Sequence, residues 1–426
     1  MKKIYTLILI ALCTISVAQK KNKFAMINGI AHVGNGTVIP SCLIVVDKDK
    51  FEMVGSIIGV RMNNSGYDTV IDLGGKHIYP ALINANNVLG LHDAFNVRAT
   101  RDINDVGYIN PHIRTLIAYN TDNKIVPTIK TNGILYTQVT PRGGMICGQS
   151  SIMALEGWNW EDAEFKADDG IHINFPQYVT RSDDDKDDKA LKNYNDQLTI
   201  LNTFMKDAAA YCASGKAEEK NLRFEAMRGV FSGDKRLYIH TDKAKDILMA
   251  INFCKTYAIR YPVLIGVKEA AKVLKDIKAS NIPVMVVRVH DLPDKADDDI
   301  DAVYKLPAML QKEGILFCLS SEGDTEMEAM NCRNLPFLAG SAVAYGLTKE
   351  EALMSITFST AKIMGIDKKI GSLEDNKTAS FVISEGDILD MKTSIITSAY
   401  IAGKPVNLKN QQTELYLKYK VKYGIK

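Results

Sequence analysis

The sequence predicts an α/β fold: a (β/α)8 barrel of the TIM type that carries a small β-sandwich formed by both termini. In the middle of the chain, short apolar runs rich in β-branched residues alternate with stretches of helical periodicity. Both ends are instead rich in short strands and turn residues. With 426 residues, 46% of them hydrophobic, the chain can bury one large barrel core and a smaller module.

The first residues have the pattern of a secretory signal peptide. Two lysines after Met1 precede the apolar run "IYTLILIALCTISV", and "SVA" offers a small-residue cleavage site with the cut after Ala18. A lipoprotein is the alternative because Cys13 lies in this region, but Leu12 stands where lipid attachment requires a small residue. No later apolar run approaches about 18 residues. We therefore expect an exported, periplasmic protein with no integral membrane segment.

The β-sandwich is expected from two regions far apart in the sequence. Residues 24–56 alternate β-branched runs with Gly, Asn and Asp turns, and the same pattern returns at 371–386 and 395–406. We assign residues 19–75 and 367–410 to the two parts of the sandwich. Residues 411–426 remain as a basic, aromatic C-terminal tail.

The barrel is expected over residues 76–366, where strands and helices alternate. The expected strands are 133–141, 236–242, 261–267, 282–291 and 315–322, and the expected helices are 243–258, 268–280 and 302–314. Continuous apolar strands separated by helices indicate parallel strands that are buried on both faces. In such a barrel the active site lies at the carboxyl ends of the strands.

Charge and cysteine content narrow the class of protein. The 52 Lys and Arg residues nearly balance the 50 Asp and Glu residues, and no basic patch stands out, so nucleic acid is not an expected partner. The cysteines beyond the leader form no CxxC pair and several lie in apolar runs. We expect buried free thiols rather than disulfides.

Five segments, in order, resemble the amidohydrolase superfamily, and in particular exported imidazolonepropionase-like members. They are residues 74–91, 131–151, 237–247, 334–366 and 370–390, which include "YPALINANNVLGL", "TPRGGMICGQSS" and "LYIHTD". The resemblance implies the barrel-plus-sandwich fold. It also implies hydrolysis of C–N bonds by water that is bound to a divalent metal such as zinc.

The metal-ligand positions that the resemblance implies are mostly lost. Asn86 and Val88 stand where the family has two histidines, Gly266 stands for a third, and Ser321 stands for the aspartate after strand eight. Neutral amides are poor zinc ligands beside imidazole, and Val and Gly offer no donor. Only His240 is retained. We therefore predict a degenerate centre with no metal cofactor.

Three histidines and a carboxylate remain as candidates for chemistry. His240 and Glu322 are tentative catalytic residues, although a core histidine is the favoured reading of His240. His92 and His290 follow presumptive strands, so they could join His240 and Glu322 in a relocated metal site. Solvated loop positions are the favoured alternative for His92.

The segment "PRGGMICGQSS", residues 141–151, is a candidate ligand-binding loop. Gly143 and Gly144 would let backbone N–H groups approach a ligand, while Gln149 and Ser150 would add polar contacts. A small anionic or amide-like ligand would suit such a loop. A plain strand-to-helix turn is the alternative.

Two functional hypotheses follow. The first is a pseudoenzyme that binds a small molecule, or that pairs with a second copy or with an active amidohydrolase relative. The second is an active metal-dependent hydrolase of C–N bonds that uses a relocated site. The chain carries neither a Gly-x-Ser-x-Gly elbow nor a phosphate-binding loop, which argues against a serine hydrolase and a nucleotide enzyme.

Overall fold

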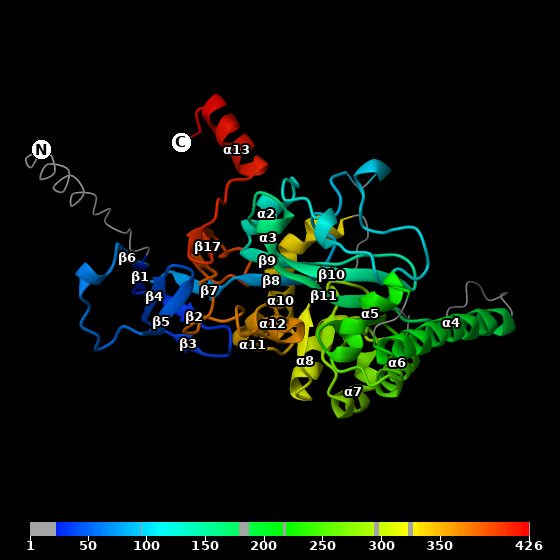
Figure 1. Cartoon of the computed structure of the whole chain (residues 1–426). Helices are drawn as coiled ribbons and strands as arrows, with labels where there is room; N and C mark the ends of the chain where they lie inside the picture. Colours follow the sequence, from blue (N-terminus) through cyan, green and yellow to red (C-terminus); the bar gives the residue numbers. More distant parts are fainter. Residues whose placement is uncertain are drawn as a thin grey trace, which may run out of the picture.

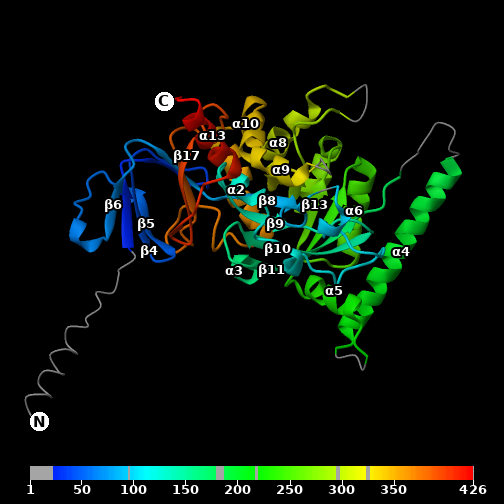
Figure 2. The same cartoon turned by 90° about the horizontal axis from the view of Figure 1, so that it is seen from above.

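A computed structural model describes residues 23–94, 96–178, 187–215, 219–293, 298–322 and 327–425. The β-sandwich lies at one side of a central barrel, and the long helix α4 projects at the opposite side (Figure 1). Figure 2 gives the view from above. The leader predicted at residues 1–18 lies outside the described residues.

The barrel is an eight-stranded sheet in which the strands follow one another in chain order. A parallel bridge between Ala85 and Ser320 links the first strand to the last and closes the sheet. The predicted (β/α)8-type barrel is confirmed. Its strands are β8 (Leu82–Asn87), β9 (Ile134–Val139), β10 (Ile146–Ala154), β11 (Glu164–Asn174), β12 (Arg236–Thr241), β13 (Pro262–Gly266), β14 (Val284–Val286) and β15 (Phe317–Leu319).

One strand departs from the all-parallel pattern. β10 is antiparallel to both β9 and β11, whereas all other neighbouring strands in this sheet are parallel. Gly143 and Gly144 have φ values of 82° and 67°, so they turn the chain straight back from β9 into β10. The alternative reading of this segment as a strand-to-helix turn was therefore wrong, because left-handed glycines reverse the chain where a crossover helix would begin.

Helices surround the rest of the barrel. In α6 the buried residues include Ile247, Ala250, Ile251 and Cys254, which recur at helical spacing and cover the sheet. The helices predicted at 243–258, 268–280 and 302–314 correspond to α6, α7 and α8. The helices are α2 (Val126–Lys130), α3 (Trp160–Ala163), α4 (Asp187–Ala213), α5 (Leu222–Ser232), α6 (Ala244–Thr256), α7 (Leu274–Ser280), α8 (Ala302–Lys312), α9 (Glu328–Asn331), α10 (Leu335–Ala344), α11 (Lys349–Ser355), α12 (Phe358–Met364) and α13 (Gln411–Lys422). Short 3-10 turns are η1 (Asn64–Gly66), η2 (Arg98–Thr100), η3 (Leu116–Ala118), η4 (Ala270–Lys272) and η5 (Cys332–Asn334).

The sandwich joins both ends of the chain. One sheet has the order β5-β4-β1-β6, and the other has the order β18-β17-β16-β7-β2-β3, so strands near the C-terminus pair with strands near the N-terminus. Met26 and Ile44 of the first sheet share one core with Ile78 and Phe381 of the second. The strands are β1 (Lys23–Ile27), β2 (Ile30–His32), β3 (Val38–Ile39), β4 (Cys42–Asp47), β5 (Lys50–Ser56), β6 (Thr69–Asp72), β7 (His77–Pro80), β16 (Phe381–Ser384), β17 (Ile396–Ile401) and β18 (Lys404–Pro405). Because β7 pairs with β2 and β16, the sheet region runs to Pro80 before the chain enters the barrel.

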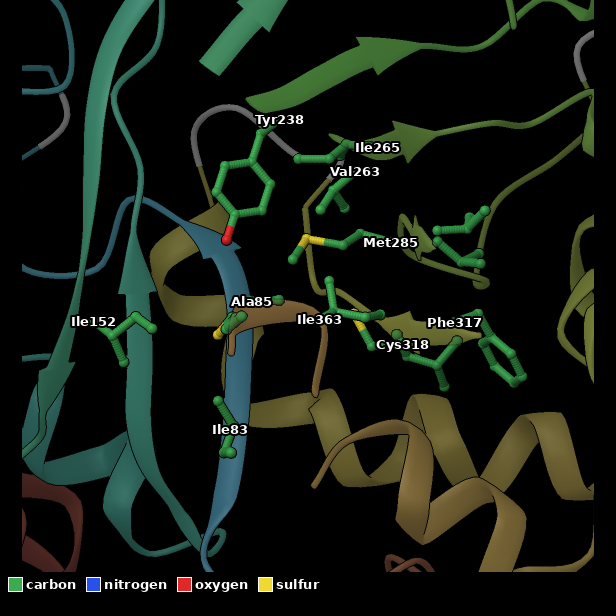
Figure 3. Close-up of a cluster of buried hydrophobic side chains, with 14 of the residues drawn as sticks. Ile83, Ala85, Ile152, Tyr238, Val263, Ile265, Met285, Phe317, Cys318 and Ile363 are labelled. Carbon is green, nitrogen blue, oxygen red and sulfur yellow. The ribbon is translucent and has the colours of Figure 1, made fainter. Parts of the chain in front are cut away.

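The barrel core is filled by apolar side chains. Figure 3 shows Ala85, Tyr238, Ile265 and Met285 from different barrel strands gathered in one buried cluster. The six cysteines beyond the leader are free thiols, five of them buried and Cys212 half-buried. Among the helices of the described residues, none is both long enough and apolar enough to cross a bilayer.

Candidate functional site

The end of β8 contains a backbone irregularity at Asn86. This residue is fully buried and has φ +51°, a left-handed conformation that asparagine tolerates better than most residues. The pairing with β9 shifts register between Asn84 and Asn87, and the Asn86 N–H is instead bonded to Gln138 Oε1 (3.0 Å). The regular alternation that would put positions 86 and 88 on one face is therefore broken, and Val88 is buried in the apolar core.

Arg142 lies against Asn86 at the centre of the site. Its Nη1 donates to Asn86 Oδ1 (3.0 Å), and its Nη2 donates to the Asn86 carbonyl (3.1 Å). The same Nη2 lies 2.6 Å from Glu328 Oε1 and 3.5 Å from Glu322 Oε1. Asn86 Nδ2 in turn donates to Glu322 Oε2. One guanidinium thus joins the end of β8, the segment after β15 and the start of α9.

Burial governs the charges of this cluster. The Glu328 side chain is 4% exposed, and burial raises its pKa to about 7, against the lowering effect of Arg142 and with a further raising effect of Glu322. Burial alone would lower the pKa of Arg142, but Glu328 and Glu322 together raise it. The guanidinium therefore stays charged, and it is the cation that compensates both carboxylates.

His240 lies beside this cluster at the end of β12. Its Nδ1 is 3.8 Å from Glu322 Oε1, and its Nε2 is 3.1 Å from His172 Nδ1. Burial lowers the pKa of His240 to about 4, although Glu322 opposes the shift, so the ring is neutral at pH 7. Nε2 of His240 and Nδ1 of His172 share one hydrogen bond, whose direction depends on the tautomers of the two rings, and Nδ1 of His240 faces the Glu322 carboxylate. Both ring nitrogens of His240 therefore face another side chain.

Beside His240 and Glu322 is a cleft of about 250 Å³ at the carboxyl ends of β12, β13 and β14. Gly266, at the end of β13, has φ +94°, and a Cβ there would lie 2.4 Å from Asp242 Oδ1. The left-handed backbone thus favours glycine at a position where the resemblance implies a histidine ligand. The cleft is lined by Gln177, His240, Thr241, Asp242, Ile265, Gly266, Lys268, Val287, Arg288, Asp291 and Glu322.

The serines after β15 hold the barrel closed. Ser320 Oγ donates to the Ala85 carbonyl (3.0 Å), and Ser321 Oγ donates to Asn84 Oδ1 (3.0 Å). Asn87 Nδ2 adds a bond to Ser321 Oγ (3.2 Å). Both serines are buried and bonded to β8, so they have a structural role. Asp324, the other carboxylate near this strand end, lies outside the described residues.

The other candidate histidines lie apart from His240. His290 Nε2 is 2.6 Å from Ser341 Oγ of α10, and the His290 ring packs near Tyr304 of α8. His92 is buried after β8, where its carbonyl accepts a bond from Asn123 Nδ2 (2.6 Å). Within the described ranges, no group of three or more His, Cys, Asp or Glu residues is arranged to hold a metal ion. The relocated metal site therefore gains no support from these residues.

The candidate ligand-binding segment 141–151 is divided between a turn and a strand. Gly143 and Gly144 form the β9–β10 turn, and Gly144 packs so close to the Tyr108 carbonyl that a Cβ would lie 2.9 Å away. Gln149 and Ser150 are buried in β10, where Gln149 Oε1 accepts from Lys235 and Ser150 Oγ donates to Asp169 (2.6 Å). A ligand role for these two side chains would require breaking internal bonds.

Sequence reasoning missed Arg142 and Glu328. Arg142 belongs to the "PRGG" stretch, but the expected ligand-binding role was assigned to the glycines that follow it. A basic residue next to a reversing turn at a strand end was a usable signal. Nothing in the sequence pointed to Glu328, because it is far from β8 along the chain and only folding brings the two together.

A TIM-type barrel with polar residues gathered at its strand ends and a two-sheet module built from both termini is the architecture that the resemblance to the amidohydrolase superfamily implies. Residues 204–412 match the family model described as the amidohydrolase family. The chain belongs to the amidohydrolase superfamily.

Solved structures agree on the fold. An amidohydrolase from Thermotoga maritima MSB8 has a TM-score of 0.76 and 23% identity, over 90% of this chain and 99% of that one. Molinate hydrolase has a TM-score of 0.53 and 12% identity, over 91% and 95%. A putative prolidase from Bifidobacterium longum has a TM-score of 0.51 and 14% identity, over 93% and 98%. No curated protein matches the chain significantly in sequence.

The residues present do not fit the divalent metal that amidohydrolases usually bind. Asn86 directs its oxygen to Arg142 and its nitrogen to Glu322, and Gly266 has no side chain. Among the ligand positions that the resemblance implies, only His240 offers an imidazole. The Arg142 guanidinium lies among the oxygen atoms of Asn86, Glu322 and Glu328, where it would repel a second cation.

Proposed function

We propose that this chain is an exported pseudoenzyme of the amidohydrolase superfamily, which lacks the metal centre and binds a small anionic or amide-like ligand in the cleft beside His240. The observation that carries the proposal is the position of the Arg142 guanidinium between Asn86, Glu322 and Glu328. Export rests on the residue pattern of the leader.

The geometry around His240 supports binding rather than hydrolysis. Metal-assisted hydrolysis needs a bound water whose pKa is lowered by the ion. Without a metal, a side chain would have to activate the water, but Nε2 of His240 is already hydrogen-bonded to His172. Both oxygens of Glu322 are also directed toward other groups, one to Asn86 and the other toward Arg142 and His240.

The cleft has the chemistry for a small polar ligand. Lys268 and Arg288 supply positive charge among three carboxylates, those of Asp242, Asp291 and Glu322, and Lys268 lies 3.2 Å from Asp291. Gln177 can pair with an amide. Its volume of about 250 Å³ is below the range of sites for drug-sized molecules, so a compact metabolite fits better than a long chain.

A role as a partner subunit is the second candidate, and α13 favours it. This helix has no buried residue, and Leu415, Tyr416, Leu417 and Val421 are all exposed on it. The partner would be a second copy of the chain or an active relative. The third candidate is an active C–N hydrolase with a relocated zinc site, and the metal analysis described next tests it as well.

The deciding measurement is the metal content of the mature chain, from Gln19 onward, purified without chelator and analysed by plasma mass spectrometry. We expect far less than one metal ion per chain and no hydrolysis of cyclic amides or dipeptides. Near-stoichiometric zinc, manganese or iron together with chelator-sensitive hydrolysis would overturn the pseudoenzyme.

Ligand binding is tested separately by thermal shift with a panel of small carboxylates and carboxamides. A compound that stabilises the wild type should lose its effect in Lys268→Ala, since Lys268 lines the cleft. Lys275→Ala is the matched control, because Lys275 is exposed on α7 outside the cleft. Equal responses in the two variants would remove the cleft from consideration.

A further inference from the structure

We propose that Arg142 is an internal cation that has taken the place of the metal ion, so that the centre of this barrel is a cation site filled by the chain itself. This inference rests on the proposed function, because a bound metal in the wild type would leave no room for it. The proposal predicts a property that would be absent if the metal site had simply been lost without a replacement. Once the arginine side chain is removed, the site should accept a small cation from solution.

The first support is a shell of oxygen atoms around the guanidinium. Four acceptors face it: Asn86 Oδ1 at 3.0 Å, the Asn86 carbonyl at 3.1 Å, Glu328 Oε1 at 2.6 Å and Glu322 Oε1 at 3.5 Å. They come from β8, from α9 and from the segment after β15. Oxygen atoms that converge from separate segments onto one positive charge form a cation site.

The second support is the charge balance of the cluster. Glu328 is 4% exposed and Glu322 is 18% exposed at the side chain, and the guanidinium contacts both. A buried carboxylate that loses its partner cation is strongly destabilising, because desolvation is no longer offset. His172 and His240, the neighbouring imidazoles, are neutral at pH 7 because burial lowers the pKa of each, so neither can replace the missing charge.

The third support is that the local backbone directs Arg142 into the site. The Arg142 N–H donates to the Ile103 carbonyl (2.7 Å), and the left-handed Gly143 and Gly144 follow at once. The left-handed conformation of Asn86 offers its side-chain oxygen and its carbonyl to the two Nη atoms. A planar guanidinium matches such a pair of acceptors, whereas the single ammonium of lysine does not.

The experiment replaces Arg142 with alanine in the full mature chain and measures the melting temperature above neutral pH. We expect a fall on the order of 10 °C, typical of breaking a buried ion pair in a chain of this size. Millimolar methylguanidinium should then raise the melting temperature of Arg142→Ala by several degrees. The wild type should show no rise, because its site is already filled.

The matched control is Arg114→Ala. Arg114 Nε also contacts a carboxylate, with both Asp168 oxygens at 2.9 Å, but the Arg114 side chain is 40% exposed. Its removal should cost little, and methylguanidinium should not stabilise the variant. The double variant Arg142→Ala with Glu328→Gln should be rescued less than Arg142→Ala, because one carboxylate of the shell is gone.

Absence of rescue, or equal rescue of Arg114→Ala, would overturn the proposal. If Arg142→Ala does not fold, Arg142→Lys and Arg142→Gln decide. The lysine variant keeps the charge and should melt well above the glutamine variant, and the reverse order would overturn the proposal. The metal analysis of the wild type is independent of these results. A metal-free wild type without rescue therefore overturns only the internal cation, while a metal-bound wild type overturns the pseudoenzyme.

Discussion

At the scale of single residues, two groups at the centre titrate in opposite senses. Burial lowers the pKa of His240 to about 4, from an ordinary value of 6.5. The unfolded chain therefore takes up this proton first, and the free energy of unfolding falls as the pH falls from 6.5 to 4. Burial raises the pKa of Glu328 to about 7, from 4.5. The folded chain takes up that proton first, so this contribution rises as the pH falls from 7 to 4.5.

We predict that Glu328→Gln loses stability more steeply on acidification than the wild type does. Without Glu328, nothing at the centre offsets the loss due to His240, and the two slopes should differ by at most about 1.4 kcal/mol per pH unit. Urea unfolding at a series of pH values between 7 and 4.5 measures the difference. Glu414→Gln, an exposed change on α13, should keep the wild-type slope. Identical slopes for all three proteins would contradict the prediction.

At the scale of elements, three barrel strands end in irregular backbone. β8 is interrupted by the left-handed Asn86, β9 reverses into an antiparallel β10, and β13 ends at Gly266 with φ +94°. Each irregularity lies at a position where the resemblance implies a metal ligand, or next to Arg142. Asn86 and the β9–β10 turn together bind and position Arg142, while the left-handed φ of Gly266 and the nearby Asp242 carboxylate disfavour a side chain at the end of β13. The proposed loss of the metal centre therefore involves the backbone as well as the side chains.

The substitution Gly266→Ala tests whether the backbone at the end of β13 disfavours a side chain. The new Cβ would meet Asp242 Oδ1 at 2.4 Å and would force an L-residue into φ +94°, so we expect a loss of about 2–4 kcal/mol in the free energy of unfolding. Gly36→Ala is the control, because Gly36 has φ +95° and nothing within 4 Å of a new Cβ. It should lose only about 1 kcal/mol from the backbone alone. Chemical unfolding of both variants gives the comparison, and equal losses would mean that β13 can adjust to a side chain. Restoring a histidine at this position should be at least as costly.

At the scale of the whole molecule, the sequence was a good guide to the fold and a partial guide to the site. Periodicity identified the strands around His240 and Glu322 and the sandwich from both ends, because burial in regular elements leaves a local pattern. Asn86 and Gly266 were found by their place in a resembling motif. Arg142 and Glu328 were missed because a contact between a turn and a distant helix produces no periodic pattern in the sequence. The antiparallel β10 was missed because a left-handed reversal and a strand-to-helix turn use the same glycines.

The last prediction concerns α13, which projects from the body of the molecule in Figure 1. None of its residues is buried, and its side-chain bond to the barrel runs from Thr128 to Gln412 (3.0 Å). Deleting residues 411–426 should therefore change the melting temperature by no more than about 2 °C, as expected for the loss of surface contacts. It should also reduce self-association, because the exposed Leu417 and Val421 are removed. Light scattering across a range of concentrations compares the full and shortened chains. A large fall in melting temperature would show that α13 supports the fold, and unchanged association would show that the contact between copies lies elsewhere.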